Sequence, residues 1–241
     1  MLICLQGCTS LTPKSGSPSA VPSNVPTDLD ITSGLFTGQP CKAPCWNNLT
    51  SGLSTGDDVN NFIDILSKNG WTGRDDRFYE SGCQSIRISD IPGHYVNKAV
   101  EFKIQNQKLT FIESVPEDTP TLGEIVDHFG DPEYIEAILA VGPEGSGHIF
   151  NVFYPTQGLA FDMLIGKNNT DPIKENIGYI TRDMKVFTIQ YFPPGDLLSY
   201  LTVKDSCYVG QDGAVENDQN AIAKYVQSWT GFGEVNWIPS K

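Results

Sequence analysis

Basic side chains are scarce in this sequence. Its 241 residues include 16 lysines and arginines against 29 aspartates and glutamates, which gives a formal net charge of −13. A nucleic-acid partner requires a basic face that neutralises phosphates, and docking on anionic lipid requires the same. The composition therefore argues against both partners. An acidic surface mainly keeps a protein soluble, and cation binding is the sharper alternative.

Recognisable catalytic motifs are also missing. The sequence has no Gly-x-Ser-x-Gly elbow, no His-Glu-x-x-His and no phosphate-binding loop. Its three histidines, His94, His128 and His148, belong to no such motif. Residues 142–147 are rich in glycine but lack the lysine of a phosphate loop, so we expect a hairpin tip there. We predict no catalytic residue, no cofactor and no enzyme activity.

Long apolar runs and metal-ligand patterns are absent as well. No run of about 18 apolar residues is present that could span a membrane. Cys41 and Cys45 are spaced Cys-x3-Cys rather than as a zinc knuckle, and no histidine is near them in sequence. Residues 212–218 are dense in acidic side chains but lack the Asp-x-Asp-x-Asp-Gly order of a calcium loop. We therefore predict no metal site.

The N-terminal residues predict the compartment. Leu5-Gln6-Gly7-Cys8 resembles a lipobox, although the basic and most of the apolar part of a signal peptide are missing. Residues 9–34 are rich in serine, threonine, proline and glycine, which is typical of a flexible tether. We expect lipidation at Cys8 and an extracytoplasmic protein that touches the bacterial cell envelope through its lipid alone. The simpler alternative is an apolar N-terminus with a stray cysteine.

Four cysteines remain once Cys4 and Cys8 are assigned to the signal peptide and the lipid. An even number of cysteines in an oxidising compartment indicates two disulfides, for which three pairings are possible. We favour Cys41–Cys45, a short local staple. The other pair is then Cys83–Cys207, which ties the first sheet to the C-terminal region.

The first half of the chain predicts a helix followed by strands. The helix spans residues 56–68, because Thr55 is a suitable N-cap and Asn69-Gly70 a suitable end. The charged residues 74–77 read as a loop. Three strands are then expected, separated by a tight turn at Asn106-Gln107 and covering residues 83–89, 99–104 and 108–114.

The second half restarts with a similar order. Thr121 and Glu124 form a capping box, and a helix follows it as far as Gly130. Strands are expected at residues 149–154, 158–165 and 184–192, then a short helix after Asp196 and a helix over residues 217–229. The predicted fold class is α+β, with two tandem helix-plus-antiparallel-sheet repeats and a C-terminal helix. The predicted divisions are residues 1–7 (signal peptide remnant), 8–35 (disordered tether), 36–115 (first repeat), 120–205 (second repeat) and 206–241 (C-terminal helix and aromatic tail).

Two sets of motifs carry a resemblance to known families. Residues 49–59 and 121–132 each open a helix from a Thr/Gly/acid pattern, and the second closes with Gly130-Asp-Pro132. These stretches resemble the SmpA/OmlA small outer-membrane lipoproteins and the β-lactamase inhibitory protein, although Leu53-Ser54 replaces the Met-containing motif. Pro44-Cys45-Trp46 and Trp229-Thr-Gly-Phe-Gly233 resemble a group of uncharacterised bacterial lipoproteins. The resemblance implies an extracytoplasmic lipoprotein with helix-plus-sheet repeats.

These observations predict a binding protein. We expect a non-enzymatic envelope or cell-surface lipoprotein that binds an envelope or secreted protein. The alternatives are an extracellular hydrolase or carbohydrate-acting enzyme with dispersed carboxylates, and an inhibitor of a secreted enzyme by analogy with the β-lactamase inhibitory protein. A possible binding surface comprises Trp46, Trp71, Phe232 and Trp237; packing of these rings in the interior is the other interpretation.

Overall fold

The computed structural model describes residues 34–79, 82–89, 99–116, 118–142, 145–165, 177–205, 207 and 226–236. Its helices are α1 (Gly56–Lys68), α2 (Leu122–Phe129), α3 (Leu197–Asp205) and the short 3-10 helix η1 (Pro155–Gln157). Its strands are β1 (Cys45–Trp46), β2 (Leu49–Thr50), β3 (Gly73–Phe78), β4 (Cys83–Ser89), β5 (Ala99–Gln105), β6 (Lys108–Val115), β7 (Tyr134–Gly142), β8 (Gly145–Tyr154), β9 (Leu159–Ile165), β10 (Ile177–Ile180), β11 (Val186–Tyr191), β12 (Val226–Ser228) and β13 (Gly233–Asn236).

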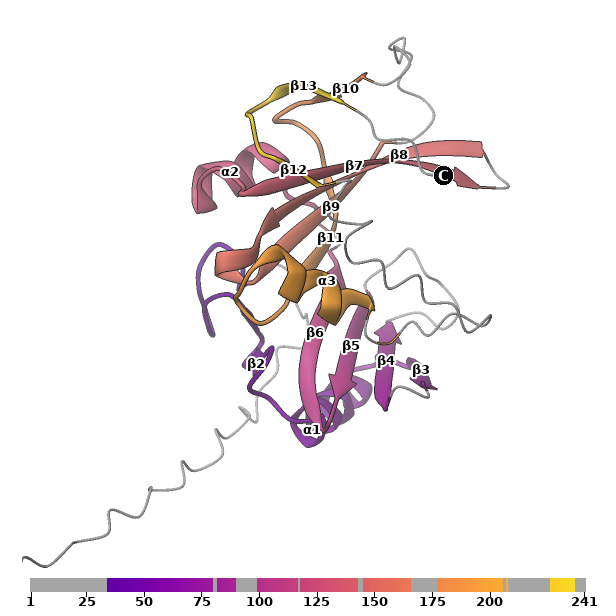
Figure 1. Ribbon diagram of the computed structural model, residues 1–241. Helices are drawn as coiled ribbons and strands as arrows, with labels where there is room; N and C mark the ends of the chain where they lie inside the picture. Colours follow the sequence, from indigo (N-terminus) through magenta and orange to yellow (C-terminus); the bar gives the residue numbers. More distant parts are fainter. Residues whose placement is uncertain are drawn as a thin grey trace, which may run out of the picture.

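One antiparallel sheet dominates the molecule (Figure 1). Its nine strands lie in the order β12-β7-β8-β9-β11-β6-β5-β4-β3. Strand accounts for 45% of the structure and helix for 22%, so the fold is mostly β, and the prediction of two tandem α+β helix-plus-sheet repeats is wrong. The two expected sheets merge because β6 pairs with β11, which satisfies backbone groups that two separate sheets would leave at their edges.

The two helix starts follow from local sequence. Thr55 Oγ1 accepts the N–H of Asp58, and the Asp58 carboxylate accepts the N–H of Thr55, which closes a capping box. Thr121 and Glu124 do the same at α2. Each box satisfies N–H groups that the first helical turn leaves free. The predicted helix at 56–68 and the predicted capping box at Thr121 are confirmed.

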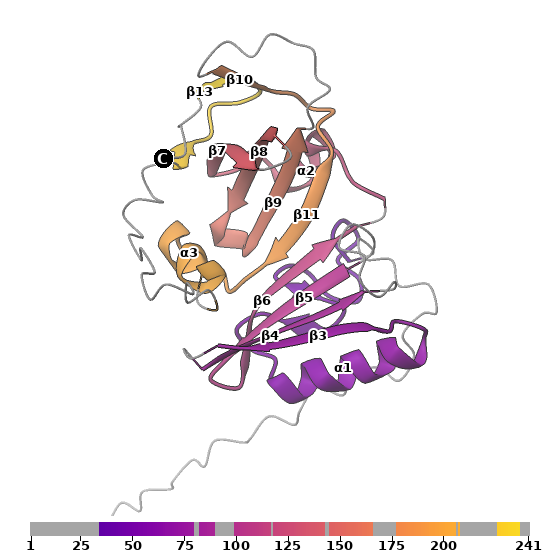
Figure 2. The same ribbon diagram turned by 90° about the vertical axis from the view of Figure 1, so that its right-hand side faces the viewer.

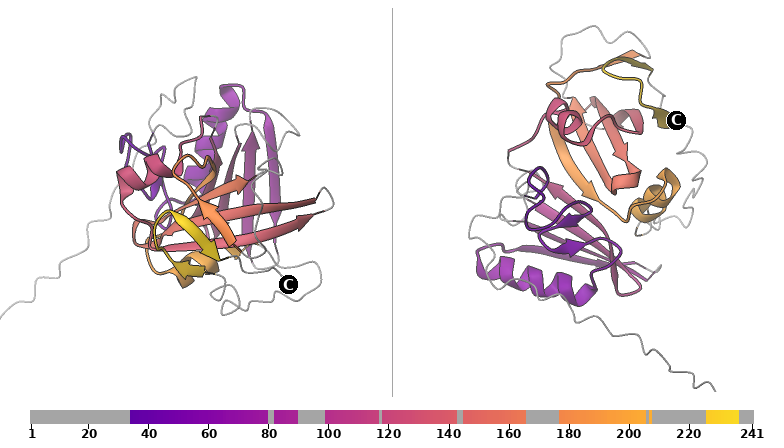
Figure 3. Two further views of the ribbon diagram at one scale, coloured as in Figure 1. Left: turned by 90° about the horizontal axis from the view of Figure 1, so that it is seen from above. Right: turned by 90° about the vertical axis from the view of Figure 1, so that its left-hand side faces the viewer.

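The convex face of the sheet carries the main hydrophobic core. Phe62 of α1 packs against Trp46 and Phe102, and Phe129 of α2 packs against Phe161. One continuous cluster of buried side chains includes residues of β4, β5, β6, β7, β8, β9 and β11. Figures 2 and 3 show α1 beside the β3–β6 half and α2 beside the β7–β11 half.

The helix α3 lies on the opposite, concave face (Figure 2). Its Tyr200 ring contacts Phe153, Phe192 and Phe111, which form a smaller apolar cluster separate from the main core. Asp196 begins this helix, because its carboxylate accepts the N–H of Ser199 at 2.7 Å. The short helix predicted after Asp196 is confirmed.

Two segments differ from their predicted structure. The charged residues 74–77 lie in β3 rather than in a loop, because pairing with β4 supplies the strand that polar residues do not specify themselves. Residues 226–228 of the predicted C-terminal helix form β12, which pairs with β7. Residues 217–225 of that helix lie outside the described residues. In the described part of the chain, no helix has the length and apolar character needed to cross a membrane.

Candidate functional site

A row of polar side chains crosses the concave face of the sheet. The strand registers place neighbouring members opposite one another from β3 to β7, with one step along β11 from Gln190 to Thr188. We call this set the polar row. Its members are Asp75, Arg87, Glu101, Glu113, Gln190, Thr188, Asp162, Asn151 and Glu136. Polar side chains in one line within otherwise apolar strands require partners, because burial without hydrogen bonds is costly.

Gln190 is the centre of the polar row. Its side chain is fully buried, and its Nε2 donates to Asp162 Oδ2 at 2.7 Å and to Glu113 Oε2 at 3.1 Å. Its Oε1 accepts the hydroxyl of Tyr200 at 2.6 Å. One amide therefore links two carboxylates of the sheet to α3, and uses both of its N–H donors to do so.

The carboxylates of the polar row are electrostatically perturbed. Burial, together with the nearby charges of Asp162 and Glu101, raises the pKa of Glu113 to about 7. Burial also raises the pKa of Asp162 above its ordinary value, while Lys204 and the Thr188 hydroxyl act in the opposite direction. Desolvation disfavours the charged form of an acid, so the folded protein favours a proton on this pair.

Two buried acceptor oxygens point to the position of one such proton. Asn151 Nδ2 donates to Glu136 on β7 at 2.6 Å, and on its other side Asn151 is the register partner of Asp162 on β9. Asn151 Oδ1 and Asp162 Oδ1 are both buried without a hydrogen-bond partner. Two acceptors cannot bond to one another, whereas a protonated Asp162 would carry a donor that its carboxylate form lacks. The raised pKa of Asp162 agrees with this arrangement.

Two lysines complete the contact between the sheet and α3. Lys103 of β5 is buried, and its Nζ donates to the Lys204 carbonyl at 2.6 Å, at the C-terminal end of α3. A cation at that end satisfies a free carbonyl and complements the helix dipole. Lys204 Nζ lies 5.6 Å from the centre of the Tyr200 ring. The attraction of Tyr200, Asp162 and Glu136 outweighs burial and raises the pKa of Lys204.

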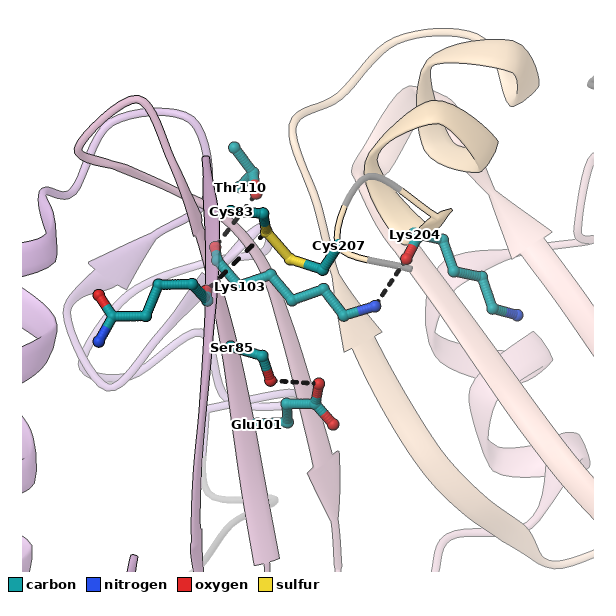
Figure 4. The surroundings of a disulfide bond; sticks show 8 residues. Cys83, Ser85, Glu101, Lys103, Thr110, Lys204 and Cys207 are labelled. Carbon is teal, nitrogen blue, oxygen red and sulfur yellow. Dashed lines mark hydrogen bonds between the residues drawn. A yellow bond between two sulfur atoms is a disulfide. The ribbon is translucent and has the colours of Figure 1, made fainter. Parts of the chain in front are cut away.

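A disulfide closes the same contact. Cys83 at the start of β4 bonds to Cys207, two residues beyond α3, with Cα atoms 5.2 Å apart (Figure 4). Cys41 bonds to Cys45 across four residues, with Cα atoms 5.7 Å apart. Both predicted pairings are confirmed. The Ser85 hydroxyl, near Cys83 in the same view, donates to Glu101 at 2.7 Å.

The edge strand β3 presents a second polar surface. Its residues Arg74 to Phe78 are all exposed, and within the described part of the chain β3 pairs with β4 alone. Arg74 forms an ion pair with Asp76 at 2.9 Å, and Arg77 forms one with Asp75 at 2.8 Å. We call the unpaired side of this strand the open edge. The aromatic ring of Phe78 stands at its end, 76% exposed.

Two of the four aromatic residues proposed as a binding surface are buried. Trp46 and Trp71 are 1% and 6% exposed, respectively, and belong to the main core. Phe232 is partly buried against Trp229, and the Arg182 guanidinium lies 5.2 Å from its ring. Trp237 and Cys8 lie outside the described residues. The buried tryptophans therefore support the packing interpretation for those two positions.

Sequence reasoning missed the polar row. A signal was present, because Glu101 and Glu113 each interrupt an apolar strand at the same phase of its alternation. Gln190 interrupts β11 in the same way. Alternation shows that these side chains share a face only once the register of the strands is known.

The described residues give no support for a metal centre, since no three His, Cys, Asp or Glu side chains among them come close enough to hold an ion. Comparisons with protein-family models, with curated proteins and with solved structures found no match to this chain.

Proposed function

We propose that this protein is a non-enzymatic binding module that is held outside the cytoplasm by a lipid on Cys8 and binds an envelope or secreted protein. The observation that carries this proposal is the open edge of β3, where five of the six strand residues lie exposed at one side of a large sheet. Exposed strand edges are a common means of recognising another polypeptide. The two disulfides support an oxidising compartment.

The hydrogen bonds of the polar row favour a binding role over catalysis. Its acidic side chains bond to groups of the protein itself: Glu136 to Asn151, Asp162 to Thr188 and Glu101 to Ser85. A general acid or base must reach a proton of its substrate within hydrogen-bond distance. Carboxylates that bond to neighbouring strands in this way have a structural use.

A hydrolase that acts through paired carboxylates is the second candidate. The observation in its favour is Glu113, whose pKa of about 7 suits a general acid at neutral pH and whose carboxylate shares the Gln190 amide with Asp162. Glycoside hydrolysis uses two such groups on either side of the scissile bond. In this interpretation α3 has to move before a substrate reaches the pair.

The experiment is photo-cross-linking in the intact envelope. A photoreactive residue in place of Phe78 is expected to capture one predominant protein, whereas the same residue in place of Asp64 on the exposed face of α1 captures none. Cys8→Ser should release the protein from the membrane fraction. Turnover of a panel of glycans and esters by the purified protein, with loss of turnover in Glu113→Gln, would replace the proposal by the hydrolase.

A further inference from the structure

The helix α3 is attached to the concave face of the sheet at three points (Figure 2). Near its middle, the Tyr200 hydroxyl donates to Gln190 Oε1 on β11 at 2.6 Å. At its C-terminal end, the Lys204 carbonyl accepts Lys103 Nζ of β5 at 2.6 Å. The Tyr200 ring also lies 6.5 Å from the Phe111 ring of β6. All three strands contribute to the polar row, so the helix and the row share one interface.

Glu113 of the polar row belongs to this interface. It follows Phe111 by two residues on β6, so both side chains point to the concave face. The Tyr200 ring of α3 contacts Phe111, and the charge of Lys204 acts on the Glu113 carboxylate. The helix therefore contributes to the burial of Glu113.

Glu113 and Asp162 form a pair of carboxylates that has few donors. Both accept from Gln190 Nε2, Asp162 at 2.7 Å and Glu113 at 3.1 Å. The Thr188 hydroxyl donates to the same oxygen of Asp162 at 2.8 Å, and Asp162 Oδ1 is buried without a partner. Two like charges on one amide nitrogen, away from water, disfavour each other. The pair therefore keeps a proton to a higher pH than an isolated carboxyl group does.

Other titratable groups surround this pair in the part of the chain that the structure describes. They are Glu101 and Lys103 on β5, Glu136 on β7, and Tyr200 and Lys204 on α3. The two lysines favour the ionised form of Glu113, whereas burial and the neighbouring acids oppose it. Burial and the acids outweigh the lysines and raise the pKa of Glu113 to about 7.

We infer that α3 is a proton-dependent cover of the polar row: it stays on the concave face while the Glu113–Asp162 pair holds a proton, and it lifts more often once that proton is lost to solvent. Water beneath a lifted helix returns the pKa of Glu113 toward its ordinary value of 4.5, whereas the pKa is about 7 under the closed helix. The equilibrium constant for lifting therefore rises with pH between these values and levels off above them. Loss of the proton thus uncovers the buried part of the polar row.

The test is amide hydrogen exchange of the complete protein with both disulfides intact, read at residues 200–205 of α3. After correction for intrinsic rates, the opening constant should be about tenfold larger at pH 8 than at pH 6. Glu113→Gln keeps the shape of the side chain but has no proton to lose, and its ratio should fall to about threefold or less. Asp64→Asn on the exposed face of α1 is the matched control and should keep the tenfold ratio.

Tyr200→Phe provides a second measurement. It removes the bond between α3 and Gln190 and leaves both carboxylates in place. The opening constant of α3 should become about fivefold larger at pH 6 and at pH 8 alike. The ratio between the two pH values should stay near that of the parent protein, because the titrating pair is unchanged.

A cover must also open without the rest of the sheet. The opening constant of α3 should exceed those of β5 and β6 by at least about tenfold. Equal constants would mean that α3 exchanges only when the whole sheet unfolds, and would overturn the assignment of a separate cover. A ratio near one in the parent protein, or a tenfold ratio retained in Glu113→Gln, would overturn its dependence on this proton.

Discussion

At the scale of single residues, the polar row depends on one amide. Gln190 satisfies two carboxylates and a tyrosine at a position where an apolar residue would satisfy none. Buried groups that lose a partner cost more than the net contribution of an intact hydrogen bond. The same few atoms that hold α3 to the sheet are therefore the ones whose substitution has the largest expected effect.

Substitution of Glu113 should change how stability depends on pH. The folded protein keeps its proton up to a pH of about 7, whereas an unfolded chain releases it near the ordinary value of 4.5. The free energy of unfolding therefore falls as pH rises between these values. Glu113→Gln should remove this fall and be more stable than the parent above pH 7, by on the order of 2 kcal/mol. Urea unfolding across this pH range measures it.

The control for this prediction is Asp64→Asn on the exposed face of α1. It should keep the pH dependence of the parent protein. If the free energy of unfolding depended on pH equally in Glu113→Gln and the parent, Glu113 would titrate alike in the folded and unfolded states.

Substitutions of Tyr200 and Gln190 should lower the free energy of unfolding by different amounts. Tyr200→Phe removes one hydroxyl and its bond to Gln190 Oε1, and should lower the free energy of unfolding by about 1 kcal/mol. Gln190→Leu leaves Tyr200, Glu113 and Asp162 without that partner, and should cost about 3 kcal/mol or more. Denaturant titration at pH 7 compares the two, and equal losses would contradict a central role for the amide.

At the scale of elements, local sequence specifies the helices and most strands. The capping threonines, Asn69-Gly70 and the Asn106-Gln107 turn act through neighbouring backbone groups, so their signals can be read directly. Pairing between strands is not local. The junction of β6 with β11 joins residues more than 70 positions apart, and this pairing decides that one sheet forms rather than two.

The polar row could not be assembled from sequence, because it depends on strand pairing that is not local. Its members come from eight strands, and each is an ordinary polar residue in its own stretch of sequence. The order of the strands turns them into neighbours. β3 was missed because its four charged residues have little strand propensity, and an edge strand needs only one partner.

The cap of α2 should contribute measurably to stability. Thr121→Ala removes the acceptor for the Glu124 N–H and should lower the free energy of unfolding by about 1 kcal/mol. Thr121→Ser retains a hydroxyl in the same place, and its free energy of unfolding should fall by only a few tenths of that amount. Thermal unfolding of both variants checks the assignment, and an equal loss in both would show that the methyl group matters rather than the cap.

At the scale of the whole molecule, a shared core joins the two halves of the sheet. The buried cluster extends from Trp46 and Phe102 in one half to Phe161 and Tyr191 in the other. Small helix-plus-strand units bury too little apolar surface to be stable alone. The halves should therefore depend on each other for folding.

Unfolding of residues 36–241 with intact disulfides should occur in one cooperative transition. The continuous core and the β6–β11 pairing leave no boundary at which one half can separate at low cost. Differential scanning calorimetry measures this directly. Two well-separated transitions, or a stable fragment 36–116, would mean that the halves are independent domains.

The two disulfides should contribute unequally. Cys83→Ser/Cys207→Ser opens a connection between residues 124 positions apart and should lower the free energy of unfolding by about 4 to 5 kcal/mol in the chain-entropy treatment. Cys41→Ser/Cys45→Ser opens a loop between residues only four positions apart and should lower the free energy of unfolding by about 2 kcal/mol. Denaturant unfolding of the two double variants ranks them, and a larger loss at the short bridge would contradict the entropic account.

The positions of these cysteines also bear on the order of events during synthesis. A growing chain emerges from its N-terminus, so Cys41 and Cys45 can join as soon as both reach an oxidising environment. Cys83 has to wait as a free thiol until 124 more residues have followed it. Early closure of the short bridge removes the two thiols that would otherwise compete for Cys83. The timing of chain emergence thus favours one of the three possible pairings before the sheet is complete.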